Sequence, residues 1–269
     1  MIIIAHPDDG EYMAAGTLSK WAKAGTEVTY VLCTSGDKGT SDPNVKPTDL
    51  AAIREVEQQN AANVVGAKNV VFLRYLDGSL QNTLELRKDL VKQIRKFQPD
   101  IVFCQDPTRR YSDWYINHPD HRAAGDAALD AIFPSARDYH VYPDLIDEGY
   151  MPHNALEVYM GTISDGANAW VDITGTIDTK IAALFEHKTQ VGDDPTRLEE
   201  IKPDLILTQD QCEVCAVSRT EVEATLTETL SQSTRIVSLT ASDVTGIWDD
   251  IKRTAEAMGA IASGVEIVR

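Results

Sequence analysis

The sequence predicts an α/β fold with a Rossmann-like, mostly parallel sheet flanked by helices. Short apolar runs rich in β-branched residues alternate with longer segments whose apolar residues recur at helical spacing. Polar residues follow the apolar runs, and ligands bind at the carboxyl ends of strands in such sheets. The 269 residues are enough for one sizeable core.

The first four predicted strands alternate with three predicted helices. In chain order they are strand 1–5, helix 14–24, strand 27–33, helix 50–65, strand 69–73, helix 83–97 and strand 100–104. Gly25 and Gly66 end the first two helices, and Pro99 stops the third. Asp49 suits the N-cap of the second helix. This alternation favours crossover connections and therefore a parallel sheet.

The pattern continues to about residue 192 and then weakens. It predicts helix 121–133, strands 156–162 and 169–173, and helix 177–191, and later helical stretches 219–231 and 244–258 around the apolar run 236–239. No repeat or linker compels a division. We expect a single domain over residues 1–269, in which the residues after about 192 form a C-terminal extension or subdomain.

Composition excludes several classes of protein. The formal charge of −17 argues against nonspecific binding of nucleic acid or anionic lipid. No apolar run approaches the ~20 residues that span a bilayer, and the start does not resemble a secretion signal. We therefore expect a cytoplasmic protein without nucleic-acid or membrane partners.

The four cysteines do not form a disulfide framework in a chain of this size. Cys33 and Cys104 lie in apolar runs, which predicts buried, inert thiols. Cys212 and Cys215 have the spacing of a zinc or redox site, but no second such pair completes four thiolates. They are either a plain thiol pair or a metal or disulfide site.

Several catalytic motifs are absent from the sequence. The turn after the first strand is no GxGxxG, so nucleotide binding has little support despite the architecture. The sequence also has no GxxxxGK[ST] phosphate loop and no GxSxG elbow of a serine hydrolase.

Two clusters carry the chemistry: His6-Pro7-Asp8-Asp9 after the first strand, and His118-Pro119-Asp120-His121 after a long polar loop. Singly, each could be a solvated turn, a helix cap or structural histidines. Together they offer the imidazole and carboxylate ligands that zinc prefers, and a catalytic zinc needs three of them. The economical division makes His6 and Asp9 ligands and turns Asp8 toward the attacking water. One of His118 and His121 completes the metal site, and the other reaches the substrate.

These two motifs resemble those of the LmbE/PIG-L family of zinc-dependent N-deacetylases. The resemblance extends in order to Glu11, Thr34-Ser35-Gly36-Asp37-Lys38-Gly39, Arg54 with Glu57, Leu76-Asp77-Gly78, Pro99-Asp100, and a segment from Lys180 to Gln190. It covers roughly the first 190 residues. The paired histidine motifs are specific, and the others support them only together.

The resemblance implies a Rossmann-like fold and a zinc ion, or another divalent metal, held by His6, Asp9 and His121. It also implies that Asp8 is the general base and that His118 stabilises the oxyanion. The expected reaction removes an acetyl group from an N-acetylated amino sugar or related small-molecule amide, a linear C–N bond, with metal-activated water. Relatives commonly form trimers or hexamers, so we expect a homo-oligomer.

The sequence departs from the family pattern in three places. Gly10 is inserted where most relatives run Asp-Asp-Glu, residues 153–161 lack an arginine that some relatives carry, and the part after Gly192 matches nothing familiar. The loop at residues 34–40 suits a plain turn as well as a substrate contact. Tyr111, Trp114 and Tyr115 could stack on a sugar or simply pack on the protein. The alternatives are a non-catalytic metal- or sugar-binding α/β protein and a nucleotide-binding one.

Overall fold

The computed structural model describes residues 1–112, 115–161, 167–191, 205–209 and 235–239. The chain forms two compact units, Met1–Gly192 and Asp193–Arg269. Their boundary coincides with the point at which the sequence pattern weakens. The assignment of residues 1–269 to a single domain stays a prediction.

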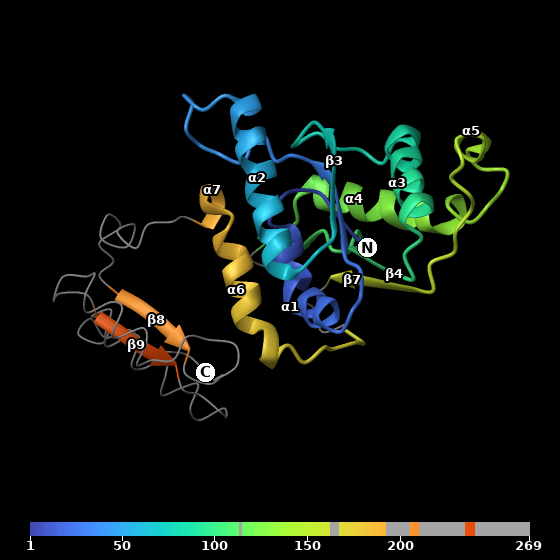
Figure 1. The fold of residues 1–269 in the computed structure, drawn as a ribbon. Helices are drawn as coiled ribbons and strands as arrows, with labels where there is room; N and C mark the ends of the chain where they lie inside the picture. Colours follow the sequence, from blue (N-terminus) through green and yellow to red (C-terminus); the bar gives the residue numbers. More distant parts are fainter. Residues whose placement is uncertain (113–114, 162–166, 192–204, 210–234, 240–269) are drawn as a thin grey trace. The chain divides into compact units, whose positions relative to one another are not determined.

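The first unit is built on a five-stranded parallel sheet of order β3-β2-β1-β4-β7 (Figure 1). Its strands are β1 (Ile2–Ile4), β2 (Thr29–Thr34), β3 (Asn69–Tyr75), β4 (Ile101–Gln105) and β7 (Glu157–Gly161). Its helices are α1 (Asp9–Lys23), α2 (Pro47–Val65), α3 (Leu84–Phe97), α4 (Pro119–Asp130), α5 (Pro143–Asp147), α6 (Ile177–Phe185) and α7 (Lys188–Val191), with irregular helical turns at Ala131–Ser135 and Thr174–Thr176. Between β4 and α4, β5 (Tyr111–Ser112) pairs antiparallel with β6 (Tyr115–Ile116). The predicted fold class is confirmed.

The core lies in two layers, one on each face of the sheet. Successive side chains of a strand point to opposite faces, so Ile3 packs with apolar residues of α3 and α4, whereas Ile2 and Ile4 pack with those of α1, α2 and α6. Figure 1 shows the two groups of helices on either side of the strands. Because both faces are covered, β1 and β2 are buried throughout, and apolar residues do not alternate with polar ones along them.

The strand order reverses between β1 and β4. The chain runs from β1 outward to β2 and β3, and then returns to place β4 on the other side of β1. A crevice at the carboxyl ends of the strands forms at such a switch point. His6 follows β1 and Gln105 ends β4, so both residues lie at this point.

Four details differ from the sequence predictions. The N-cap of α2 is Lys46, and Asp49 lies in the first turn, because Pro47 suits the first helical position. Residues 169–173 form no strand, since they are largely exposed and Trp170 is 80% exposed. The helix predicted at 177–191 is divided into α6 and α7, with His187 between them. The helix predicted at 14–24 begins earlier, at Asp9.

The second unit contains a described parallel pair, β8 (Leu205–Gln209) and β9 (Arg235–Leu239), with Leu205 opposite Arg235. The run predicted at 236–239 is therefore a strand, and β8 was not predicted. Cys212, Cys215 and the two predicted helical stretches lie outside the described residues. In the first unit, Cys33 and Cys104 are free and fully buried, and burial raises the pKa of both thiols.

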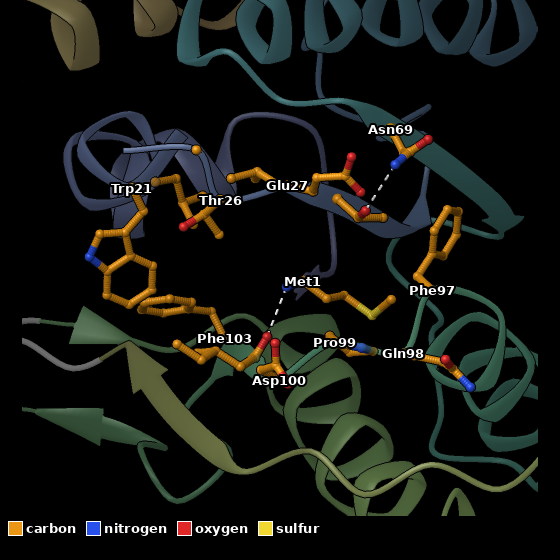
Figure 2. Close-up of a pocket in the computed structure, with 15 residues that line it drawn as sticks. Met1, Trp21, Thr26, Glu27, Asn69, Phe97, Gln98, Pro99, Asp100 and Phe103 are labelled. Atoms are coloured by element: carbon orange, nitrogen blue, oxygen red, sulfur yellow. Dashed lines mark hydrogen bonds between the residues drawn. The ribbon is translucent and has the colours of Figure 1, made fainter. Parts of the chain in front are cut away.

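At the opposite, amino-terminal end of the strands lies a pocket of about 490 Å³. Trp21, Phe103 and Phe97 line it, and the Met1 amino group donates to Ile101 O at 2.8 Å (Figure 2). This pocket lies at the other end of the sheet from His6. Among the described helices, none is both long and apolar enough to cross a bilayer.

Candidate metal centre

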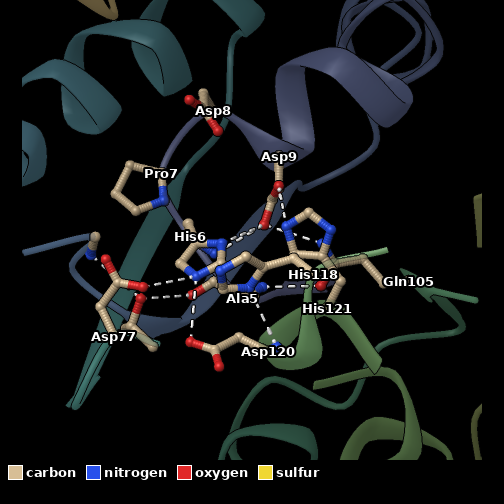
Figure 3. A network of polar contacts seen from close by, with 12 residues as sticks. Ala5, His6, Pro7, Asp8, Asp9, Asp77, Gln105, His118, Asp120 and His121 are labelled. Carbon is tan, nitrogen blue, oxygen red and sulfur yellow. Dashed lines mark hydrogen bonds and ion pairs between the residues drawn. The ribbon is translucent and has the colours of Figure 1, made fainter. Parts of the chain in front are cut away.

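Loops after β1, β3 and β4 converge on the buried ring of His6 (Figure 3). Its Nε2 lies 3.0 Å from Asp77 Oδ1 and 3.3 Å from Asp120 Oδ2, and its Nδ1 lies 3.4 Å from Asp9 Oδ2. Burial lowers the pKa of His6, but hydrogen bonds to the three aspartates outweigh burial and raise it to about 11. Three carboxylates around one buried ring favour a cation at this place.

The carboxylate of Asp9, at the start of α1, lies between two histidines. Its Oδ2 accepts from the His6 backbone N at 2.8 Å and from Gln105 Nε2 at 2.9 Å, and its Oδ1 lies 3.0 Å from His121 Nε2. Burial raises the pKa of Asp9, but the hydrogen bonds with His121 and His6 hold it well below its usual range. The group is therefore ionised and directed at both rings.

The start of α4 positions the second pair of histidines. His118 is the N-cap and His121 lies in the first turn. Their ring centroids are 5.3 Å apart, and the His6 ring lies 4.9 Å from His118 and 5.2 Å from His121. The structure thus brings the two sequence clusters together around one point. His118 Nδ1 accepts from the Asp120 backbone N at 3.2 Å, and His121 Nδ1 lies 3.3 Å from Asn117 Oδ1.

Asp8 lies on the turn between β1 and α1, beside this group rather than within its hydrogen bonds (Figure 3). Its Oδ2 accepts from Arg54 Nη2 at 3.3 Å, and its backbone N donates to Gln58 Oε1 at 3.2 Å. Burial and the neighbouring Asp9 raise the pKa of Asp8 to about 6, against the opposing effect of Arg54. A carboxylate with a raised pKa beside such a cluster is a candidate proton acceptor.

Two groups of described residues could hold a metal ion: His6 with His118 and His121, and His6 with Asp77 and Asp120. Within each group, one ligand atom per residue lies within 4.8 Å of the others. Asp9 belongs to neither group, and its two oxygens face different histidines. Imidazole nitrogens and carboxylate oxygens are the donors that zinc accepts, so this part of the chain fits a divalent cation.

Comparison with known proteins assigns the family. The PIG-L family, described as GlcNAc-PI de-N-acetylase, matches residues 1–132. A diacetylchitobiose deacetylase of Thermococcus kodakarensis is 34% identical over 200 residues, which cover 74% of this chain and 73% of the relative. The chain belongs to the PIG-L family. The resemblance drawn from the two histidine motifs is therefore confirmed.

Two solved structures are similar to the structure of this chain. An N,N'-diacetylchitobiose deacetylase from Pyrococcus horikoshii, in complex with its inhibitor MPG, matches with a TM-score of 0.67 and 35% identity, covering 74% of this chain and 73% of that one. A conserved protein of Thermus thermophilus matches with a TM-score of 0.57 and 25% identity, covering 75% of this chain and 83% of that one. The Rossmann-like prediction is borne out by both.

Residues 187–190, in the segment from Lys180 to Gln190, contact the helices that carry the site. His187 Nε2 lies 3.1 Å from Glu11 Oε2, and Thr189 donates to Glu57 through both its backbone N and its hydroxyl. Gln190 Nε2 donates to the carbonyl of Gly39 at 2.9 Å. These contacts tie residues 187–190 to α1, to α2 and to the loop after β2.

Sequence reasoning left two site residues unnamed, Gln105 and Asn117. Gln105 holds Asp9 and also accepts from the Ala5 backbone N at 3.0 Å, and Asn117 faces His121. Only their positions in the sequence could have indicated them: Gln105 is the last residue of a strand, and Asn117 directly precedes a histidine motif. Amides in such places supply donors and acceptors that fix the orientation of metal ligands.

The loop after β2, left open as turn or substrate contact, is tied to the loop after β3. The Lys38 backbone N donates to Asp77 Oδ2 at 2.9 Å, and Lys38 Nζ donates to the Asp77 carbonyl. Asp77 in turn holds His6.

Gly10 is the second residue of α1, where a Cβ would lie 2.7 Å from Tyr30 Cε1. Glycine therefore suits this position, where α1 lies close to the Tyr30 ring and any side chain would have to displace that ring.

Proposed function

We propose that this protein is a metal-dependent N-deacetylase that hydrolyses the acetamide of a small N-acetylglucosamine-containing molecule. The observation that carries the proposal is the Asp9 carboxylate held between His6 and His121, with Asp8 adjacent. Membership of the PIG-L family supports it, as do the names of the two chitobiose deacetylases.

We favour His6, Asp9 and His121 as the ligands, because one ring nitrogen of each histidine faces an oxygen and the other is left for the metal. Oxygens of Asp77 and Asp120 face His6 Nε2, which leaves Nδ1 for a metal. The Asn117 amide oxygen faces His121 Nδ1, which leaves Nε2. Ligand histidines usually donate their other N–H to such oxygens. Zinc bound here would lower the pKa of water and polarise the acetamide carbonyl.

His118 is better suited to the substrate than to the metal. Because its Nδ1 accepts the Asp120 N–H, the neutral ring carries its proton on Nε2, which has no lone pair for a metal. Burial and the nearby His6 lower the pKa of His118, which favours this neutral form. Its Nε2–H would donate to the carbonyl oxygen as negative charge develops there.

Asp8 is the proposed general base. Its carboxylate takes a proton from the attacking water while the new C–O bond forms, and that proton then passes to the departing nitrogen as the C–N bond breaks. The products are acetate and the free amine. Arg54 holds the carboxylate through Nη2 and also donates to the Pro7 and Gly36 carbonyls, which fixes its own position.

Exposed aromatic residues near the second histidine motif are candidates for contact with the sugar. Tyr111 is 77% exposed and could stack on a sugar ring, and Trp114 lies outside the described residues. A cytoplasmic location and assembly as a trimer or hexamer stay predictions. The alternative is a non-catalytic protein that uses the same residues to hold a metal or a sugar.

Replacement of two adjacent aspartates tests the division of roles. Asp8→Ala should lower kcat for amine release from N,N'-diacetylchitobiose by orders of magnitude and leave the bound metal in place. Asp9→Ala should lose both metal and activity. Loss of metal from Asp8→Ala would contradict the division, and unchanged activity in both variants would contradict the assignment of Asp8 and Asp9 to the active site.

A further inference from the structure

The backbone of Asp8 is strained. Its φ of 85° and ψ of −31° lie in a region that residues with a side chain rarely adopt. Such a conformation persists only where surrounding contacts hold it. The Asp8 carbonyl accepts from the backbone N atoms of Glu11 and Tyr12 at 3.0 and 3.1 Å, which attaches it to the first turn of α1. The Asp8 N–H faces away from that turn, toward α2.

Gln58 of α2 accepts this N–H. Its Oε1 lies 3.2 Å from the Asp8 N, and its Nε2 donates to both carboxylate oxygens of Glu11 at 3.2 and 3.3 Å. A backbone N–H can only donate and an ionised carboxylate can only accept, so the amide has one satisfactory orientation. Gln58 and Glu11 are both fully buried.

A buried histidine holds the far end of this chain of contacts. His187, between α6 and α7, is fully buried and lies 3.1 Å from Glu11 through Nε2. Its Nδ1 has no hydrogen-bond partner among the described residues. This series of hydrogen bonds therefore runs from His187 through Glu11 and Gln58 to the backbone of Asp8, and it joins α1, α2 and the turn between α6 and α7.

We propose that Gln58 is a positioning residue for the reaction, which holds Asp8 in its strained backbone conformation and so aims its carboxylate. The role differs from that of Arg54, which contacts the carboxylate itself. Without the Gln58 acceptor, the backbone of Asp8 can relax toward an ordinary conformation. The Asp8 carboxylate then moves away from the position of the attacking water. This inference rests on the proposed function, in which Asp8 is the general base.

Gln58→Met keeps the length of the side chain and removes its hydrogen bonds to Asp8 and to Glu11. We expect kcat for amine release from N,N'-diacetylchitobiose to fall about 10- to 100-fold, the loss that a misplacement of ~1 Å causes. KM should change less than threefold and the metal content should not change, because no proposed ligand contacts Gln58. Gln58→Glu, which keeps the acceptor for Asp8 and shares one proton with Glu11, should recover most of the loss. Gln59→Met is the matched control, since Gln59 is exposed on the same helix.

The decisive comparison repeats Gln58→Met in the Asp8→Ala background. A residue that acts through Asp8 has nothing left to position there, so residual activity should change less than twofold. An equal loss in both backgrounds, or a loss of metal, would overturn the positioning role and leave Asp8 as base. If Asp8→Ala alone retains full activity, the proposed role of Asp8 as general base fails, and the positioning role of Gln58 fails with it. If Gln58→Met does not fold, Gln58→Glu is measured instead, against the same control, Gln59→Met. A kcat of Gln58→Glu about tenfold below that of Gln59→Met would overturn the role of Gln58.

Discussion

Asp120 offers the sharpest test of how the loops hold the metal centre. Its side chain is fully buried, and its Oδ2 accepts from Gly78 N at 2.6 Å and lies 3.3 Å from His6 Nε2. Its Oδ1 accepts from Leu80 N at 3.1 Å. Asp120→Asn keeps the shape of the side chain but leaves one oxygen for three donors.

The size of the effect follows from this count of donors. With its oxygen toward Gly78 and His6, the amide NH₂ faces the Leu80 N–H, which loses its acceptor. One buried donor without a partner costs about 1–3 kcal/mol, and loss of the charged acceptor adds to it, so we expect about 2–4 kcal/mol of destabilisation. Loss of the anion behind His6 should also weaken metal binding about 10- to 100-fold.

Thermal or urea unfolding and a competitive zinc titration measure the two effects on Asp120→Asn. Asp126→Asn is the matched control, because Asp126 is exposed on the same helix and the change removes the same charge. Comparable behaviour of the two variants would refute the reasoning. A drop in stability with unchanged zinc affinity would refute the link between Asp120 and His6 alone.

Three further changes test other parts of the structure. Arg95→Met should destabilise the protein by about 3–5 kcal/mol in urea unfolding, because the buried guanidinium donates to five backbone carbonyls of residues 135–142; a change under ~1 kcal/mol would contradict this. Gly10→Ala should lower the melting temperature despite the better helix propensity of alanine, since overpacking against Tyr30 costs about 1–3 kcal/mol. A rise in melting temperature would show that the approach can relax. His118→Gln should lower kcat about 100- to 1,000-fold and retain the metal; loss of metal would make His118 a ligand.

The sequence predicted the sheet because its inner strands contain short, continuous apolar runs. Residues 30–33 of β2 form such a run, which separates the strand from amphipathic helices without any tertiary information. The run 169–173 has similar residue types but is not a strand, and nothing in a local pattern tells whether a neighbouring strand is available. β8 was missed in the part of the chain where the periodicity is weak.

The candidate site divides in the same way. His6, Asp9 and His121 could be identified as candidate metal ligands, because histidine and aspartate after the ends of strands are typical of metal sites. Gln105 and Asn117 could not, because an amide gains its role only from what lies opposite it, and that is set by the fold. The strain at Asp8 was also hidden: its φ depends on how the turn joins β1 to α1.

The central claim is that His6, Asp9 and His121 hold a metal that this protein needs for N-deacetylation. Metal analysis of the purified chain, combined with amine release from N,N'-diacetylchitobiose before and after chelation, tests it most directly. We predict about one zinc ion per chain, loss of amine release on chelation, and recovery when zinc is restored. Amine release that survives complete removal of the metal would contradict the claim, as would a nucleotide-dependent thermal shift in a chain without zinc.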